Sequence, residues 1–241
     1  MANLLVEIGN TALKAAWSEG STLGKTFRYQ GEKVIEYILS LVEKDRPEVM
    51  ALASSREILP EEEETLRGRC SHLMIMDGVH SDFLYRYSLP EYLTYDRAAS
   101  IVAARFLFKN KPCSIFDFGT TLTVDFLDAG GNYLGGNISP GCRTRFKSLN
   151  RYARSLPIVN TPVTPVGKGN SLESSVGAGV ITGIMFEIEG YARLHPDNIM
   201  IFTGGDAIYF AKRMKNSIFV VCNLVLMGLA LMTDDYVRKY L

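Results

Sequence analysis

The sequence predicts an α/β fold of two duplicated domains, each with a mixed sheet flanked by helices, and a cleft between the domains. One six-residue pattern occurs twice, as Val6-Glu7-Ile8-Gly9-Asn10-Thr11 and as Phe116-Asp117-Phe118-Gly119-Thr120-Thr121. Each copy ends an apolar run and leads into a second strand-like run. The 241 residues suffice for two domains, which we place at 1–110 and 111–241.

Strand-like runs and helical spacing alternate through the first half. After the first copy of the repeat we expect a hairpin partner around 24–30. The first half should then contain helices at 31–45, 61–69 and 96–110 and strands at 48–54 and 73–76. The segment 109–112 marks the crossing into the second half.

The second half opens with alternation of Thr121, Thr123 and Asp125 on one face, which predicts a half-buried strand. A returning strand at 133–138, a helix at 171–194, a strand at 199–203 and a closing helix at 222–241 should follow. The segment 135–141 is rich in turn-forming residues. We expect it to place backbone against a ligand or against the other half.

Composition excludes several classes of protein. Hydrophobic residues make up 47% of the chain and the formal net charge is zero, so the chain can build a core but lacks the basic footprint of a nucleic-acid binder. Glu7 interrupts the first apolar run, which argues against a signal peptide. The apolar stretch 218–232 is too short to span a membrane. Scattered cysteines fit a reducing compartment. We expect a cytoplasmic protein that binds neither nucleic acid nor membrane.

The two repeated turns carry the chemistry that points to phosphate. Glycine lets the backbone approach a phosphate closely, and Asn and Thr side chains add hydrogen bonds. The acidic residue two positions before each glycine, Glu7 or Asp117, is placed to hold a cation. The alternative is an ordinary hairpin turn with a capping Asn or Thr. Two copies, each with an acid, favour phosphate binding.

Other candidate sites remain open on the residues alone. Asp96 and Arg97 head a strong helix and could bind a polar ligand, or they could be an N-cap and an exposed cation. Gly204 and Gly205 follow a strand, where they could admit a flat base or simply form a connection. The small residues of the 171–194 helix indicate close packing, either internal or between subunits. His72, His80 and His195 show no ligand spacing, and we assign them no role.

The ordered set EIGNT, YDR, DFGTTLTVD, GGNISPG, GNSLESSVGAG and FTGG resembles the type III pantothenate kinases and runs from residue 7 to residue 206. The resemblance implies the actin-like ATPase and sugar-kinase architecture, with two ribonuclease H-like domains. It also implies ATP-dependent phosphorylation of pantothenate, the first step of coenzyme A synthesis. The implied cofactors are Mg²⁺ and a monovalent cation, K⁺ or NH₄⁺, and the implied assembly is a homodimer.

The resemblance also implies roles by position. ATP is expected to contact Thr120 and the first loop, which consists of Glu7, Ile8, Gly9, Asn10, Thr11, Ala12, Leu13 and Lys14. The substrate is expected to contact Tyr87, Thr94, Tyr95, Asp96, Arg97 and, across the dimer, Ser171. Asp96 is expected to act as general base and Asp117 to hold the monovalent cation.

Three residues depart from the family pattern. Glu7 stands for Asp, Thr94 for Gly and Ser171 for Thr. Two other functions therefore stay open: a kinase or phosphatase of the same superfamily with another small substrate, and a nucleotide-binding regulator of the accessory-factor type without kinase activity.

Overall fold

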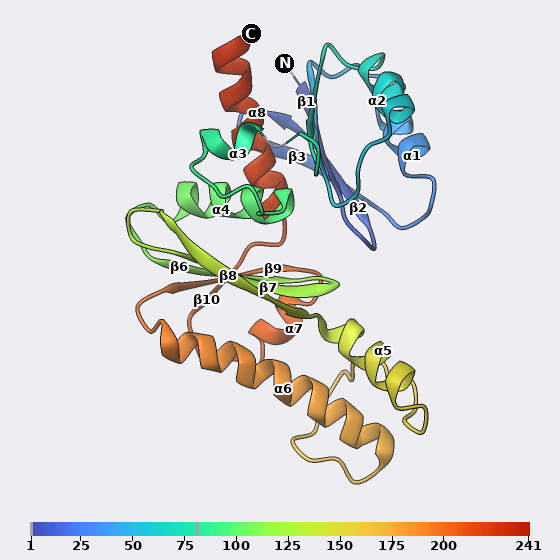
Figure 1. Ribbon diagram of the computed structural model, residues 1–241, viewed down its shortest axis with the longest axis vertical. Coiled ribbons are helices and arrows are strands. Elements are labelled where there is room, and N and C mark those ends of the chain that lie inside the picture. The colour runs from blue at the N-terminus through green and yellow to red at the C-terminus, as the bar shows by residue number, and fades with distance from the viewer. Residues whose placement is uncertain (1, 81) are drawn as a thin grey trace. The chain divides into compact units, whose positions relative to one another are not determined.

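The computed structural model describes residues 2–80 and 82–241, which form two compact units. The first unit consists of Met1–Lys109 together with Asn223–Leu241, and the second of Asn110–Cys222. Each unit has its own five-stranded sheet (Figure 1).

The first unit has the sheet order β3-β2-β1-β4-β5. Its strands are β1 (Ala2–Ile8), β2 (Leu13–Glu19), β3 (Thr22–Tyr29), β4 (Val49–Ser54) and β5 (His72–Met76). Its helices are α1 (Val34–Leu41), α2 (Pro60–Arg67), α3 (Asp82–Arg86), α4 (Tyr95–Leu107) and α8 (Leu224–Tyr240). β1, β2 and β3 form an antiparallel meander, while β4 and β5 continue the sheet parallel to β1.

Successive side chains of β1 point to opposite faces of the sheet, and each face of the first unit has its own core. Leu4, Val6 and Ile8 pack with the buried residues of α1 and α2, such as Ile38. Residues at the intervening positions, including Glu7, face the other side of the sheet, where α8 contacts β1 and β4 and α4 contacts β4. This parity places the Glu7 carboxylate on the same side as α4.

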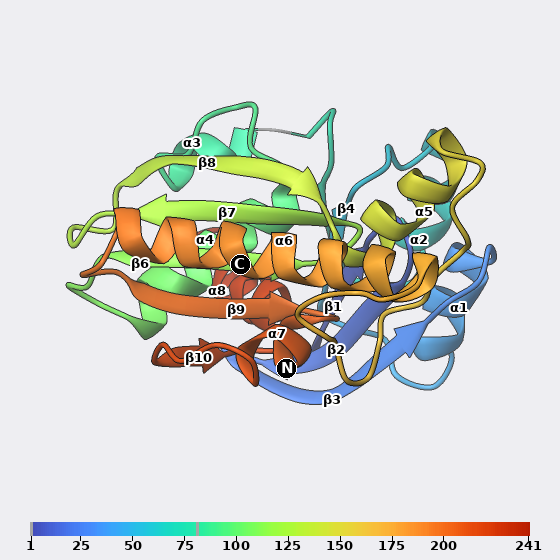
Figure 2. The same ribbon diagram turned by 90° about the horizontal axis from the view of Figure 1, so that it is seen from below.

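The second unit has the sheet order β10-β9-β6-β7-β8. Its strands are β6 (Cys113–Phe118), β7 (Thr121–Leu127), β8 (Tyr133–Pro140), β9 (Ile199–Gly204) and β10 (Ile218–Val220). Its helices are α5 (Cys142–Tyr152), α6 (Leu172–Leu194) and α7 (Ala207–Ala211). Figure 2 shows α6 lying along this sheet, and its buried residues Val180, Ile184 and Ile188 join the aromatic core of β6.

The two sheets have the same topology. In each, three antiparallel strands are followed by two strands parallel to the first. Glu7 and Asp117 occupy the same place, the last but one residue of the first strand. The first hairpin is one residue longer, because Ile8 pairs with Leu13 while Phe118 pairs with Leu122. The internal repeat read from six residues therefore corresponds to a duplicated fold.

The units differ from the domain ranges 1–110 and 111–241 at the C-terminal helix. α8 belongs with the first unit because it packs along α4. At the crossing point Gly228 is so near the backbone of Ala99 that a Cβ would come within 2.8 Å of the Ala99 Cα. Residues this distant in sequence give no local sign of their contact.

Two further points concern the segment after β7. The returning strand expected at 133–138 is β8, which continues to Pro140 through the segment rich in turn-forming residues and pairs with β7. Gly135 keeps a turn-like feature, a φ of 118°. Helix α5 follows at once and was not expected, because its sequence is polar and only Cys142 and Phe146 are buried.

Candidate functional site

The first loop is a tight hairpin at the carboxyl end of β1. The Gly9 N–H donates to the Ala12 carbonyl at 3.1 Å. Ser55, the residue after β4, donates to the Ile8 carbonyl from its N–H at 2.9 Å and from its hydroxyl at 3.0 Å. β4 therefore holds the start of the loop. Ser55 was not among the expected site residues, although its position directly after a parallel strand could have indicated it.

The Glu7 carboxylate is paired with the Lys14 ammonium group across this hairpin. The Lys14 ammonium group is 3.3 Å from Glu7 Oε2, and the Glu7 side chain is 15% exposed. Burial raises the pKa of Glu7, Lys14 lowers it, and the negative charge of Asp96 raises it further, so that the net shift is upward. The first loop and the residue expected to be the general base are thus close enough to interact electrostatically within one unit.

The expected substrate loop forms the start of α4. Thr94 is the N-cap residue, with a φ of −68°, so threonine is unstrained at this position where the family has glycine. Tyr95 is buried and its ring lies 5.1 Å from that of Phe83. Asp96 accepts a hydrogen bond from the Arg97 N–H at 2.9 Å through Oδ1. Arg97 is only 6% exposed, so the alternative of an N-cap Asp beside an exposed Arg is wrong.

Tyr87 is fixed by two other elements of the first unit. Its hydroxyl donates to Asp235 of α8 at 3.4 Å, and its carbonyl accepts from Arg105 of α4 at 2.7 Å. Burial, followed by the charge of Asp235, raises the pKa of Tyr87. The tyrosine is therefore a neutral hydroxyl at any pH at which the protein works.

The second loop is held by the start of α5. The Thr120 carbonyl accepts from the Gly141 N–H at 3.0 Å and from the Thr144 hydroxyl at 2.6 Å. A Cβ on Gly141 would lie 2.8 Å from the Thr120 oxygen, so only glycine fits. The segment that ends at Gly141 thus lies against the second hairpin of its own unit. Thr144 was missed because α5 was missed.

Asp117 has a threonine opposite it on each neighbouring strand, whereas Glu7 is paired with the Lys14 ammonium group. Its register partners are Thr123 on β7 and Thr203 on β9, both at least nine-tenths buried. Carboxylate and hydroxyl oxygens suit hard cations. The oxygen donors around Asp117 therefore fit K⁺ or Mg²⁺ better than the Glu7–Lys14 pair does.

Gly204 and Gly205 differ in how closely other atoms approach them. Gly204 has a φ of 89°, and a Cβ there would lie 2.6 Å from the Phe118 nitrogen and in collision with Asp117 Oδ1. The absence of a side chain at Gly204 thus leaves room for Asp117 and for the Phe118 backbone. Gly205 is unconstrained, with the Phe118 oxygen 4.0 Å from the position of a Cβ.

Ser171 is the N-cap of α6 and is exposed. Its hydroxyl accepts from the Ser174 N–H at 3.1 Å, and the Ser174 hydroxyl lies 2.9 Å away. Among the expected site residues, the first unit contains Glu7, Lys14, Tyr87 and Asp96, and the second contains Asp117, Thr120 and Ser171.

Metal binding by protein groups alone is not indicated. Across residues 2–80 and 82–241 no cluster of three or more His, Cys, Asp or Glu side chains could hold a metal ion. In the same residues, no helix has the length and hydropathy to span a membrane.

Comparison with known proteins identifies the family. A family model described as type III pantothenate kinase matches residues 3–194. The type III pantothenate kinase of Flavobacterium johnsoniae is 33% identical over 235 residues, covering 94% of this chain and 95% of that protein. The corresponding protein of Christiangramia forsetii is 35% identical over 232 residues, covering 94% and 96%.

Solved structures agree on the fold. A Campylobacter jejuni protein assigned to the Baf family of transcriptional activators has a TM-score of 0.66 at 21% identity, covering 98% of this chain and 99% of that one. The ROK hexokinase of Thermus thermophilus has a TM-score of 0.53 at 12% identity, covering 96% and 98%. The two units are ribonuclease H-like domains of the actin-like ATPase and sugar-kinase type, and the chain belongs to the type III pantothenate kinase family.

Proposed function

We propose that this protein transfers the γ-phosphoryl group of ATP to the primary hydroxyl of pantothenate, the first step of coenzyme A synthesis. Family membership supports the reaction. The observation that carries it to particular residues is the proximity of Asp96 to Glu7 within the first unit, where the charge of Asp96 raises the pKa of Glu7. A phosphate loop and an acceptor loop that meet in this way can bring a hydroxyl to a phosphoryl group.

In this proposal each unit contributes its own hairpin as a phosphate-binding loop for ATP. In the first unit Lys14, whose charge is shared with Glu7, contributes positive charge, and in the second unit the Thr120 hairpin contributes backbone N–H groups and a hydroxyl. Asp117, Thr123 and Thr203 form the oxygen set that would hold a cation, K⁺ or NH₄⁺, and Mg²⁺ would arrive with ATP and neutralise charge on its phosphates.

Asp96 is the proposed general base. Its Oδ1 is engaged by the Arg97 N–H, which fixes the orientation of the carboxylate and leaves the second oxygen to accept the proton of the attacking hydroxyl. Tyr87, held by Asp235, and Thr94 are proposed to contact the acceptor. The transition state is loose, so positioning supplies much of the rate.

The test is Asp96→Asn in a coupled assay with ATP and pantothenate. We expect kcat to fall by about 10²–10⁴-fold, with an unchanged melting temperature, because the amide cannot accept the proton. Near-full turnover by the variant would remove Asp96 from this role. Turnover by the wild type of another small alcohol, but not of pantothenate, would favour a related kinase, and binding of ATP without any turnover would favour a regulator.

Assembly and location complete the proposal. The second unit has exposed apolar residues on α6 and on the edge strand β8, with Phe186 at 64%, Leu134 at 62% and Ile138 at 59% exposure. These residues support a homodimer in which Ser171, at the start of the same helix, contacts the partner's substrate. Sedimentation of the wild type and of Phe186→Arg tests this assembly, and the variant should be monomeric. We propose a cytoplasmic location, which fractionation would test.

A further inference from the structure

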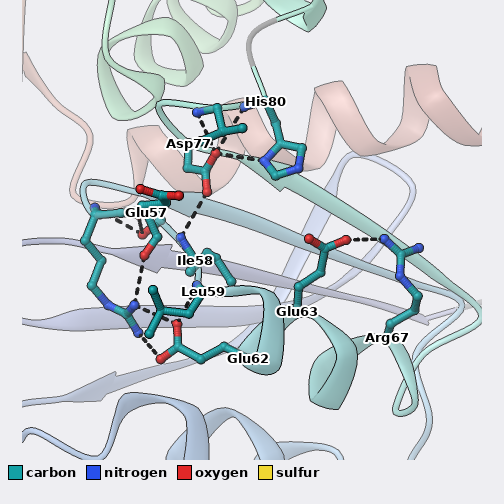
Figure 3. A network of polar contacts seen from close by, with 11 residues as sticks. Glu57, Ile58, Leu59, Glu62, Glu63, Arg67, Asp77 and His80 are labelled. Atoms are coloured by element: carbon teal, nitrogen blue, oxygen red, sulfur yellow. Dashed lines mark hydrogen bonds and ion pairs between the residues drawn. The ribbon is translucent and has the colours of Figure 1, made fainter.

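Polar networks outside the proposed machinery occur in both units. In the first unit the completely buried Asp77 accepts a hydrogen bond from the Ile58 N–H at 3.1 Å and lies 2.8 Å from Nδ1 of His80. Figure 3 shows these contacts joining the loop after β4 to the loop after β5. The hydrogen bonds of this network involve those two loops. In the second unit a network centred on Arg145 reaches the hairpin that contains Thr120.

Arg145, in the first turn of α5, connects three elements of the second unit. Its Nε donates at 2.7 Å to the carbonyl of Pro140, the last residue of β8. Its Nη2 donates to the Ser139 hydroxyl at 3.1 Å and to the carboxylate of Glu187 on α6. The Ser139 hydroxyl in turn donates to the other oxygen of Glu187 at 2.7 Å. The guanidinium is therefore held in one orientation by β8 and α6 together.

The ion pair between Arg145 and Glu187 is largely shielded from water. The two side chains are 22% and 21% exposed. Nη1 of Arg145 lies 3.9 Å from the position that a Cβ on Gly183 would take, so the guanidinium lies against α6. A planar guanidinium can bind a carboxylate and a carbonyl together in a fixed geometry, which an ammonium group does not do.

A single peptide group connects Arg145 to the second hairpin. The bond between Pro140 and Gly141 is trans, so its carbonyl and its N–H point in opposite directions. The carbonyl accepts from Arg145, and the N–H donates to the Thr120 carbonyl at 3.0 Å. A donor on the carbonyl polarises the peptide group and strengthens the hydrogen bond that its N–H makes. Arg145 therefore acts on Thr120 through this peptide group.

Strand pairing alone does not require the bond from Arg145. β8 is an edge strand, and Pro140 lies opposite Thr121 at the end of its pairing with β7. Because the N–H of Gly141 donates to Thr120, the Pro140 carbonyl points away from β7. Water can hydrate a carbonyl on the free side of an edge strand. The guanidinium thus adds to what the sheet needs, at a peptide group that holds a proposed phosphate ligand.

We propose that Arg145, oriented by Glu187, is a positioning residue that fixes the second hairpin for binding the phosphates of ATP. The proposal rests on the proposed function, in which Thr120 contacts ATP. A hairpin that is already ordered loses less conformational freedom when the phosphate binds, and its affinity is higher. The effect should appear in the affinity for ATP and not in that for the acceptor, because most of the expected acceptor ligands belong to the first unit.

The experiment separates positioning of the hairpin from stability of the ion pair. Kd for ATP by titration calorimetry, KM for both substrates and melting temperature are measured for the wild type, Arg145→Met, Glu187→Gln and the double variant. We expect Arg145→Met to raise Kd and KM for ATP about tenfold and to leave KM for pantothenate within about twofold. Its melting temperature should also fall, because a partly buried Glu187 loses its cation.

The double variant is the decisive comparison. With Glu187 neutralised, its melting temperature should return towards that of the wild type, but Kd for ATP should stay raised because the Pro140 carbonyl still lacks its donor. Glu187→Gln alone keeps a neutral acceptor for the guanidinium and should raise Kd for ATP about threefold in a folded protein. Arg151→Met, at an exposed arginine in the last turn of α5, is the matched control and should change neither quantity.

Three outcomes would overturn the role of Arg145. Recovery of ATP affinity together with the melting temperature in the double variant would reduce the residue to an ion-pair partner. An equal rise in KM for both substrates would mean general loosening, and an unchanged Kd for ATP in Arg145→Met would mean that the peptide group holds the hairpin without it. If the wild type binds ATP but does not phosphorylate pantothenate, the proposed function fails while the Arg145 comparison stands on Kd. If it does not bind ATP, both fail.

Discussion

Gly204 and Gly205 offer a matched pair of substitutions at the proposed cation site. Gly204 has a φ of 89°, and a Cβ there would meet Asp117 Oδ1 and the Phe118 backbone. Gly205, its neighbour, has no such constraint. Gly204→Ala should therefore damage the site, and Gly205→Ala should leave it intact.

The magnitude follows from the contacts. A Cβ on Gly204 would lie 2.6 Å from the Phe118 nitrogen and oxygen, whereas ordinary contact begins at 3.4 Å, so β6 or β9 must move by about 0.8 Å. The left-handed φ costs alanine about 1–2 kcal/mol and the overlap about 1–3 kcal/mol. A loss of about 2–5 kcal/mol lowers the melting temperature of a unit of this size by about 10–20 °C.

Gly204→Ala should reduce kcat/KM by more than its loss of stability alone would cause. Moving the Asp117 carboxylate by nearly an ångström misplaces the cation and the phosphate beside it, which can cost about 10²-fold in kcat/KM. The assay measures kcat/KM for ATP against K⁺ concentration, together with thermal unfolding, for both variants. Gly205→Ala should stay within about 0.5 kcal/mol of wild type. Equal behaviour of the two variants would refute the reasoning.

Three other predictions concern the rest of the site and its support. Because burial and a neighbouring carboxylate raise the pKa of Glu7 above 4.5, the folded state binds this proton more tightly than the unfolded state. That stabilisation is present below pH 4.5 and is lost as the pH rises through the pKa of Glu7 in the folded state. The variant Glu7→Gln should therefore melt at a higher temperature than the wild type at pH 7 but not at pH 4. A higher melting temperature of the variant at pH 4 only would contradict this prediction. Gly228→Ala should lower the free energy of unfolding by about 1–3 kcal/mol in denaturant titrations, since the added Cβ overlaps the backbone of Ala99. An unchanged unfolding midpoint would show that α8 can move away from α4 without cost. Thr144→Val removes the 2.6 Å hydrogen bond to the Thr120 carbonyl and should raise KM for ATP about fivefold without changing KM for pantothenate; equal effects on both would point to general loosening.

Local patterns predicted the duplicated core and the places of its two acids. The equivalent positions of Glu7 and Asp117 could be predicted from the sequence, because residues close together in the chain specify a strand followed by a glycine hairpin. The start of α4, with Asp96 in its first turn, was predicted within one residue for the same reason.

Long-range contacts could not be read in this way. The burial of Arg97 and the position of α8 depend on side chains far apart in the chain. Asp77 resembled an ordinary Asp-Gly turn, and its complete burial depends on Ile58 and on the packing of two loops. His80 showed no spacing, because its partner is a carboxylate whose importance only burial reveals.

The packing of α8 on α4 also bears on synthesis of the protein. Residues 223–241, which complete the first unit, are translated after the whole of the second unit, 110–222. Domains usually fold as they leave the ribosome, N-terminal first. Here the second unit can fold on the ribosome while the first unit still exposes the face of α4 around Ala99. The first unit, although most of it is synthesised first, should therefore complete its folding last, and its exposed face should be the one that a chaperone covers.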